Sequence, residues 1–428
     1  MFSRCFKSQS SSSLVLLTNF LEFLDLYLFI YFGWLINKLF FQDWSPDTIK
    51  YFTFLNIYGV APIACVFLAY LGDLYGRKPI ILNTAALMGV VSISIIFLPV
   101  EQYPYVSACG LIALRILQGI ALGGEPMGAY LFVMEEKKDI REATFFVYIT
   151  RITEGIGGLL ALLCGWVVIG GLGEEYWRLL FVVIGIFIMV AFVIRKYLHE
   201  TTEYQENLSN ARIHIYERAK IREIYHAREK QWQNTIAGTL FWISYPVMFT
   251  ICYLYLTPYV CQRMGWPESW MMYYNFAVLL GEIGFSFLLA YSILYFTRFD
   301  LRMVGVVVNT LGLVVTGISL MYLDELSIAG VFATQIAMIV LINYGWVFPE
   351  LFKTFSVIGR YTTMGTTWAI ARFISFFTCT FLISRLIEWY GLGMGALILI
   401  MVINAFAFIG FVIMKPYSTI QKELGYAY

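Results

Sequence analysis

Charged residues are scarce in this sequence. Asp, Glu, Lys and Arg make up 13% of the 428 residues, whereas hydrophobic residues make up 60%. A soluble domain carries roughly 25% charged residues, so we expect most of this chain to lie in lipid. The formal net charge of +1 provides no broad basic surface, and we therefore expect no nucleic-acid partner.

Histidines and closely spaced cysteine pairs are missing from the hydrophobic runs. All three histidines, His199, His214 and His226, fall in one polar stretch, which excludes a histidine proton relay within the membrane. The seven cysteines form no Cys-x-x-Cys pair, and most lie in apolar runs. We interpret them as small packing residues rather than disulfides or metal ligands. We expect no metal, no cofactor and no enzymatic activity, because the apolar runs carry no nucleophile–base pair.

What the sequence does have is long apolar runs. Each is about 20 residues or more, which at roughly 1.5 Å per residue spans a bilayer core of about 30 Å. The twelve runs are 14–37, 51–71, 79–99, 105–129, 142–170, 176–195, 233–260, 268–296, 302–322, 327–349, 361–386 and 391–414. The first contains Glu22 and Asp25, and it is too long and too charged for a cleaved signal peptide. These runs predict an all-α membrane protein with twelve transmembrane helices.

A polar, charged stretch divides the runs into six and six. We expect an N-terminal six-helix bundle over 1–197, a cytoplasmic linker over 198–231 and a C-terminal six-helix bundle over 232–428. Lys and Arg gather on alternate connecting segments, and the opposite side holds only Lys38, Lys50, Arg178, Arg263 and Arg385. Because positive residues are retained in the cytoplasm, both termini are predicted to be cytoplasmic in a multi-pass protein of the cell inner membrane.

A charged turn separates the second and third runs. Residues 69–78 read AYLGDLYGRK, in which Gly76 allows a tight backbone and Arg77 and Lys78 favour the cytoplasmic side. The turn resembles the Gly-x-x-x-Asp-x-x-Gly-Arg-Lys signature that major facilitator superfamily transporters carry between helices 2 and 3. Ala69 stands at the first glycine of that signature. The alternative interpretation is an ordinary positively charged loop.

Two other stretches resemble the metabolite:proton symporter group, which includes proline/betaine, citrate, 2-oxoglutarate and shikimate carriers. Residues 115–125 (RILQGIALGGE) are similar to Arg-x-x-Gln-Gly-x-x-x-Gly-Gly-Glu. Residues 19–27 (NFLEFLDLY) are similar to Asn-x-x-Glu-Trp-x-Asp-x-Tyr, with Phe23 at the tryptophan. The resemblance implies the major facilitator fold, in which runs 3, 6, 9 and 12 are peripheral and the other eight surround or complete a central cavity.

Ionisable residues well inside the runs fall only on runs that the resemblance places at the cavity. Charge within a bilayer costs several kcal/mol, so these side chains should face protein or water. Asp25 lies about 16 Å from one membrane face and Arg115 about 15 Å from the other, so both are near the midplane. We interpret them as a proton-coupling pair in which a proton arriving at Asp25 releases Arg115, with Glu22 as a relay. A static ion pair that only fixes helix packing is the alternative.

Two deep arginines indicate the type of substrate. Arg151 in the fifth run and Arg372 in the eleventh lie about 15–18 Å into the membrane. One guanidinium from each half could grip a carboxylate, and closure of the halves around it would give alternating access. The alternative is that Arg151 pairs locally with Glu154, and Arg372 with Glu282 or a backbone carbonyl. All four side chains are candidate substrate contacts.

Aromatic residues and the charged turn complete the candidate set. Tyr27 and Trp368 are candidate cavity-lining residues, although a given aromatic is more often a packing or interfacial residue. Asp73 is predicted to accept hydrogen bonds from the end of the eleventh run, or from Arg77 and Arg141, and so to latch the outward-open state. The gating set is Asp73, Gly76, Arg77, Arg141 and Glu125.

The sequence therefore predicts a secondary active transporter. We expect symport of protons with a small polar metabolite, either an organic acid, an amino acid or a betaine-like zwitterion. The expected partners are this small molecule, protons and membrane lipid, and we expect a monomer. A facilitator or exporter of a carboxylate siderophore or drug-like compound remains an alternative, as does a transporter-like sensor. A proton ionophore would distinguish the two transport mechanisms, because it abolishes uptake by symport and leaves facilitated transport unchanged.

Overall fold

The structure is a computed structural model that describes residues 11–42, 44, 59–206, 232–267, 270–296 and 301–415. Across these residues the regular structure is helical. This is expected in lipid, because a helix hydrogen-bonds its backbone N–H and C=O groups within its own segment where no water is present. Eleven of the described helical segments are long and apolar enough to cross a membrane. They are Ser11–Phe29, Arg77–Phe97, Pro104–Glu136, Ile140–Gly170, Glu174–Arg195, Trp232–Met264, Trp270–Tyr295, Leu301–Met321, Ile328–Phe352, Gly359–Tyr390 and Leu392–Ile413. Ala61–Tyr75 is a shorter apolar helix.

The chain divides into two compact units. The first comprises Met1–Glu136 and Ile149–Thr201, and the second comprises Lys137–Tyr148 and Thr202–Tyr428. The segment Lys137–Tyr148 thus groups with the second unit, although it precedes the polar stretch in the sequence. Of the linker expected over 198–231, residues 207–231 lie outside the described part of the chain.

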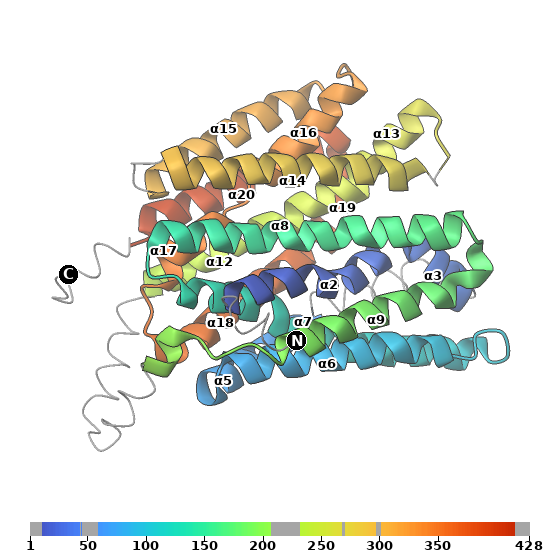
Figure 1. Cartoon of the computed structure of the whole chain (residues 1–428). Helices are drawn as coiled ribbons and strands as arrows, with labels where there is room; N and C mark the ends of the chain where they lie inside the picture. Colours follow the sequence, from blue (N-terminus) through green and yellow to red (C-terminus); the bar gives the residue numbers. More distant parts are fainter. Residues whose placement is uncertain are drawn as a thin grey trace. The chain divides into compact units, whose positions relative to one another are not determined.

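The first unit is built around α6 and α7. Its helices are α2 (Ser11–Tyr31), α3 (Gly33–Phe40), α5 (Ala61–Tyr75), α6 (Arg77–Ser94), α7 (Pro104–Glu136), α9 (Trp177–Arg195) and, from Ile149 onward, α8 (Ile140–Gly165). Helix α6 packs against both α7 and α9, α5 packs against α7, and α2 packs against α7 and α9 (Figure 1). Three helices, α2, α6 and α7, therefore meet along one seam.

The second unit is built around α12 and α20. Its helices are α12 (Trp232–Phe249), α13 (Thr257–Met264), α14 (Trp270–Phe296), α15 (Leu301–Met321), α16 (Ile328–Leu341), α17 (Phe348–Phe352), α18 (Val357–Phe377), α19 (Ile383–Tyr390) and α20 (Leu392–Ile413). Helix α12 packs against α18 and α20, while α15 packs against α16 and α20. Helix α14 packs against α16.

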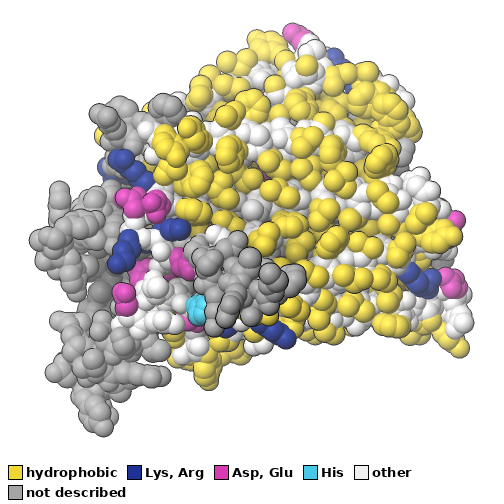
Figure 2. Space-filling view, in the orientation of Figure 1, with side chains coloured by type: hydrophobic (Ala, Val, Ile, Leu, Met, Phe, Trp, Pro, Cys, Tyr) yellow, Lys and Arg dark blue, Asp and Glu magenta, His cyan; other side chains and the backbone are white. Residues whose placement is uncertain are grey.

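Large hydrophobic side chains cover the outer faces of these helices. Figure 2 shows hydrophobic side chains over the helix flanks, with Lys, Arg, Asp and Glu gathered toward the helix ends. Phe67, Leu288 and Val307 are each at least 60% exposed. Apolar surface on this scale is normal for helices that face acyl chains, and it is not expected on a soluble monomer.

Two of the expected runs are not continuous helices. The first run turns at Phe32, between α2 and α3. The tenth run leaves helical geometry after Leu341, and Asn343 Oδ1 accepts a hydrogen bond from the Gly345 N–H at 3.2 Å. The hydroxyl of Tyr344 donates to Asn309 on α15, so buried side chains stabilise this break. Such a break is tolerated at membrane depth because protein surrounds it.

The seventh run contains a π-helical turn, Thr250–Leu256, between α12 and α13. A π-helical turn disturbs the regular backbone ladder and leaves carbonyl groups that need other donors. Gln335 Nε2 on α16 donates to the Cys252 carbonyl at 2.7 Å, and the Tyr274 hydroxyl on α14 donates to Gln335 Oε1 at 2.6 Å. Three helices of the second unit are joined at this turn.

Helices α2 and α8 approach each other closely at Gly157. A Cβ atom at this position would lie 2.3 Å from the carbonyl oxygen of Phe20. Nearby, Asn19 Nδ2 donates to the Thr150 carbonyl at 3.1 Å and to Thr153 Oγ1 at 2.9 Å. The small residue permits the backbone contact, and the amide fixes the register of the two helices.

Candidate functional site

A buried carboxylate lies where α2, α6 and α7 meet. Asp25 on α2 is fully buried, and its Oδ2 lies 3.3 Å from Arg115 Nη1 on α7. Gln118 Nε2 lies 3.0 Å from both carboxylate oxygens, and Ser92 Oγ on α6 donates to Oδ1 at 2.8 Å. The carboxylate thus accepts hydrogen bonds from three side chains on two other helices.

The cation of this pair is also enclosed. Arg115 Nη1 donates to Gln118 Oε1 at 2.7 Å, and its guanidinium carbon lies 3.6 Å from the centre of the Phe29 ring. Removing two charges from water costs several kcal/mol per ion unless the partners and hydrogen bonds compensate. In this arrangement the carboxylate of Asp25 and the guanidinium of Arg115 form an ion pair. Oδ1 of Asp25 also accepts hydrogen bonds from the neutral side chains of Ser92 and Gln118. A proton added to Asp25 would cancel its attraction for Arg115.

Ser92 and Gln118 were not among the predicted site residues. Ser92 lies in the third run, which carries no charge and was expected to be peripheral. Gln118 follows Arg115 by three positions, so both lie on one face of α7. This spacing could have indicated from the sequence that Gln118 lies beside the Asp25–Arg115 pair. No comparable signal marked Ser92, because a serine in a helix often bonds its own backbone.

A second buried carboxylate lies between α7 and α8. Glu154 Oε1 accepts a hydrogen bond from the Tyr130 hydroxyl at 2.5 Å. Its other oxygen, Oε2, is bound by Arg151 Nη1, one turn earlier on α8. Glu154 and Tyr130 are 3% and 4% exposed. The local pairing that was the alternative for Arg151 is therefore present, and Tyr130 is an additional partner that the sequence did not indicate.

The second unit carries three more candidate substrate contacts, Arg372, Trp368 and Glu282. The Arg372 guanidinium carbon lies 5.0 Å from the centre of the Trp368 ring on the same helix, a cation–π contact. Glu282 on α14 is buried and accepts a hydrogen bond from the Tyr253 hydroxyl at 3.0 Å. In the first unit, the buried ring of Tyr27 stacks on Tyr31 with centroids 5.6 Å apart.

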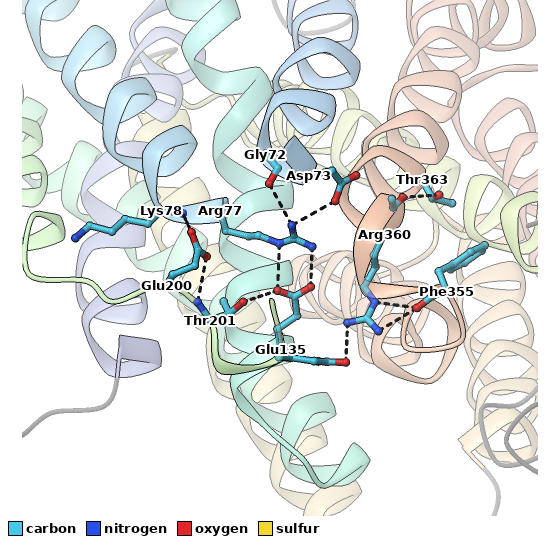
Figure 3. Close-up of polar contacts among 12 residues, drawn as sticks. Gly72, Asp73, Arg77, Lys78, Glu135, Glu200, Thr201, Phe355, Arg360 and Thr363 are labelled. Carbon is cyan, nitrogen blue, oxygen red and sulfur yellow. Dashed lines mark hydrogen bonds and ion pairs between the residues drawn. The ribbon is translucent and has the colours of Figure 1, made fainter. Parts of the chain in front are cut away.

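The charged turn forms a buried ion-pair network in the first unit (Figure 3). Gly76 connects α5 to α6. Its φ of 105° is a backbone conformation that favours glycine. Arg77 is fully buried, with its Nη1 3.4 Å from Asp73 Oδ1 and 3.1 Å from the Gly72 carbonyl. Its Nε and Nη2 donate to the two oxygens of Glu135 at 3.2 and 3.0 Å. The turn is thus tied to the end of α7 by a bidentate ion pair.

The same network extends to the segment after α9. Thr201 Oγ1 donates to Glu135 Oε2 at 2.7 Å, and the Lys78 N–H donates to Glu200 Oε2 at 3.1 Å. At the end of α9, the buried Arg195 donates to Thr18 Oγ1 on α2 at 2.8 Å. Glu135, Thr201 and Arg195 were not predicted as site residues. Glu135 and Arg195 lie at helix ends and Thr201 follows α9, and polar residues at such positions usually face solvent.

An arginine in the second unit has a similar set of contacts. Arg360 on α18 lies 3.1 Å from Glu203, and its Nε and Nη2 donate to the Phe355 carbonyl at 3.2 and 3.0 Å. Like Arg77, it binds a carboxylate together with the carbonyl five residues earlier in the chain. Arg141, from the predicted gating set, is exposed near the start of α8, and its N–H donates to Asp139. The side chains of Glu22 and Glu125 are outside the described part of the structure.

Comparison with known proteins gives the family. Residues 15–355 match the model of the Major Facilitator Superfamily. The Salmonella typhi citrate-proton symporter is 28% identical over 250 residues, covering 56% of this chain and 55% of that protein. The Escherichia coli inner membrane metabolite transport protein YhjE is 24% identical over 402 residues, covering 87% and 86%. The proline/betaine transporter of Salmonella typhimurium is 23% identical, covering 62% and 56%. The matched region thus spans little more than half the length of the first and third of these relatives.

Solved structures show the same fold. The proton:xylose symporter XylE aligns with a TM-score of 0.70 at 15% identity, covering 94% of both chains. The Escherichia coli fucose:proton symporter FucP aligns with a TM-score of 0.69 at 14% identity, covering 94% of this chain and 99% of that one. The predicted fold class, an all-α membrane protein with the major facilitator fold, is confirmed. This chain belongs to the Major Facilitator Superfamily and is a multi-pass membrane transporter, not an enzyme.

Proposed function

We propose that this chain is a proton symporter that moves a small polar metabolite bearing a carboxylate. The favoured substrates are an organic acid, an amino acid or a betaine-like zwitterion. The relatives named as a citrate-proton symporter and a proline/betaine transporter support this range. The proposal includes the inner membrane, two six-helix bundles over 1–197 and 232–428 joined by 198–231, both termini in the cytoplasm, and alternating access.

One observation supports proton coupling above the others. Asp25 is a fully buried carboxylate 3.3 Å from Arg115 and is hydrogen-bonded to Ser92 and Gln118. The pair joins α2 to α7, so a proton that discharges Asp25 would weaken one of the bonds between these helices. A change in protonation would thereby be coupled to helix movement. Glu22, one turn before Asp25, remains the proposed relay.

The substrate carboxylate is proposed to bind deep arginines. Arg151 in the first unit and Arg372 in the second supply planar guanidiniums, which match a carboxylate in two-point geometry. Trp368 packs on Arg372 and would hold its guanidinium in place. Glu154, Glu282 and Tyr27 complete the proposed contact set.

The charged turn is proposed to act in gating. Asp73, Gly76 and Arg77 form a compact turn that Glu135 ties to α7. Movement of this turn would carry α5 and α6 together. Arg141 and Glu125 belong to the same proposed gating set.

The experiment has two stages. A thermal-shift screen of the purified protein against citrate, shikimate, L-proline and glycine betaine identifies a ligand, because a ligand that binds the folded state raises the unfolding temperature. Uptake of that ligand into proteoliposomes is then measured under an inward proton gradient, with and without a proton ionophore. Symport predicts accumulation that the ionophore abolishes. Uptake that is indifferent to the ionophore would indicate a facilitator, and binding without uptake would indicate a sensor.

A further inference from the structure

Arg151, Glu154 and Tyr130 form a cluster whose described hydrogen bonds include none to Asp25 or Arg115. Glu154 uses one carboxylate oxygen for the Tyr130 hydroxyl at 2.5 Å and the other for Arg151. The Glu154 side chain is 4% exposed and the Arg151 side chain 13% exposed. The cation is thus the more accessible member of a largely buried ion pair.

The described partners of Glu154 come from two helices, and a third helix packs beside them. Arg151 lies on α8 with Glu154, and Tyr130 is contributed by α7. Helix α2 packs on α8 through Asn19, which binds Thr150 and Thr153. Of the acids on α2, Asp25 is bound to Arg115, and the side chain of Glu22 is not described, nor is that of Glu125 on α7. Among the described contacts of Glu154, the positively charged partner is Arg151 and the neutral partner is Tyr130.

A guanidinium already bound to a carboxylate is a poor site for a second carboxylate. The incoming anion would bring an extra negative charge into a region of low dielectric, where uncompensated charge is costly. A proton on Glu154 removes that obstacle. Protonation ends the charge attraction between Glu154 and Arg151, while the neutral carboxylic acid keeps hydrogen-bonding capacity toward Tyr130.

We propose that Arg151 and Glu154 form an exchange site, in which a proton bound by Glu154 and a substrate carboxylate bound by Arg151 enter together. Before binding, the ion pair is Arg151 with Glu154; after binding, it is Arg151 with the substrate. The cluster carries no net charge in either state, because the added proton balances the added carboxylate. Tyr130 is a positioning residue that holds Glu154 against α7.

This inference rests on the proposed function and makes it more specific. Within the proposed contact set, Glu154 competes with the substrate carboxylate for Arg151. Because proton and carboxylate promote each other's binding, substrate affinity is expected to fall about tenfold per pH unit once Glu154 is ionised. A zwitterion or an acid would bind through its carboxylate, and an analogue without that group would not.

The experiment measures binding of citrate, shikimate, L-proline and glycine betaine by calorimetry from acidic to mildly alkaline pH. Choline and L-prolinol serve as carboxylate-free analogues of glycine betaine and proline. In the wild type, the best-binding acid should weaken about tenfold per pH unit at the alkaline end. Glu154→Gln should hold the affinity at its acidic limit across the range, and Arg151→Gln should lose binding at every pH. Glu174→Gln is the matched control, because Glu174 is an exposed glutamate paired with Lys38, and it should behave as the wild type.

Each outcome is decisive. A wild type that binds a carboxylate with a steep pH dependence that Glu154→Gln retains would overturn this inference and leave the proposed function standing. A wild type that binds none of the four carboxylates at any pH would overturn both. If Glu154→Gln does not fold, Glu154→Asp provides the test, because its shorter side chain gives up the Tyr130 hydrogen bond. The midpoint of its pH profile must then differ from that of the wild type, and an unmoved midpoint contradicts the proposal.

Discussion

Arg77 Nη2 lies 3.0 Å from Glu135 Oε1, and both side chains are completely buried. A second bond from Arg77 Nε to Glu135 Oε2 makes the pair bidentate. Removing one partner would leave the other charge buried, which costs about 3–5 kcal/mol. Arg77→Met and Glu135→Leu are each expected to lower the unfolding temperature of the detergent-solubilised protein strongly.

The double variant distinguishes the pair from its parts. Arg77→Met with Glu135→Leu should be clearly more stable than the sum of the single effects predicts, because neither charge is then left without its counter-ion. Arg178→Met is the control, since Arg178 pairs with the exposed Glu101. If the buried single variants melt no lower than this control, the pair does not stabilise the turn.

Asp73 provides the test of gating. In the gating proposal its carboxylate helps to hold the outward-open state, so Asp73→Ala should raise the population that is open to the cytoplasm. Cysteines introduced in the cytoplasmic half of the helices would be labelled faster by a maleimide reagent in this variant. An unchanged labelling rate in a folded Asp73→Ala protein would remove Asp73 from the gate.

Gly157 is expected to tolerate no side chain. A Cβ atom there would meet the Phe20 carbonyl at 2.3 Å, so α2 and α8 must move apart in Gly157→Ala. Overpacking of this kind costs about 1–3 kcal/mol. Gly284→Ala is a matched control, because Gly284 also lies inside a helix but a Cβ atom added there would meet no neighbouring group within 4 Å. Thermal unfolding of the two variants should differ, and equal stabilities would contradict the observed packing.

The sequence predicted the positions of Asp25 and Arg115 better than it predicted their surroundings. Charges near the middle of two apolar runs must face protein or water, so depth alone brought these two residues to the same level. Nothing comparable pointed to Ser92, because a hydroxyl on an apolar helix carries no such constraint. Tyr130 was missed for a related reason, since phenols are common in this chain and its bond to Glu154 depends on how α7 and α8 pack.

Breaks within helices could also not be predicted from the sequence. The tenth run carries no charged residue, and periodicity alone cannot distinguish it from a continuous helix. Its break after Leu341 depends on Tyr344 reaching Asn309, which lies in another helix. Helix ends gave the same difficulty, because Glu135 follows the apolar stretch of the fourth run and its burial against Arg77 comes only with the folded unit.

Arg372 is expected to need its guanidinium geometry. Lysine keeps the charge but loses the planar fork, so Arg372→Lys should reduce uptake of a carboxylate ligand by tenfold or more, on the order of 1.4 kcal/mol. Insertion and thermal stability should stay near the wild type. Arg385→Lys is the control, because Arg385 is exposed and pairs with Glu388 on its own helix. Transport kinetics in Arg372→Lys that match this control would exclude Arg372 from the substrate site.

Asp25→Asn gives the most direct measurement of proton coupling. The change keeps the size of the side chain, and its remaining amide oxygen can still accept from Ser92 and Gln118, but it removes the charge opposite Arg115. Asp324→Asn, at an exposed aspartate, is the control. In proteoliposomes with an inward proton gradient, Asp25→Asn should bind ligand and exchange it across the membrane but accumulate it to a lower level than the wild type. Accumulation at the level of the wild type, still abolished by a proton ionophore, would contradict a coupling role for Asp25.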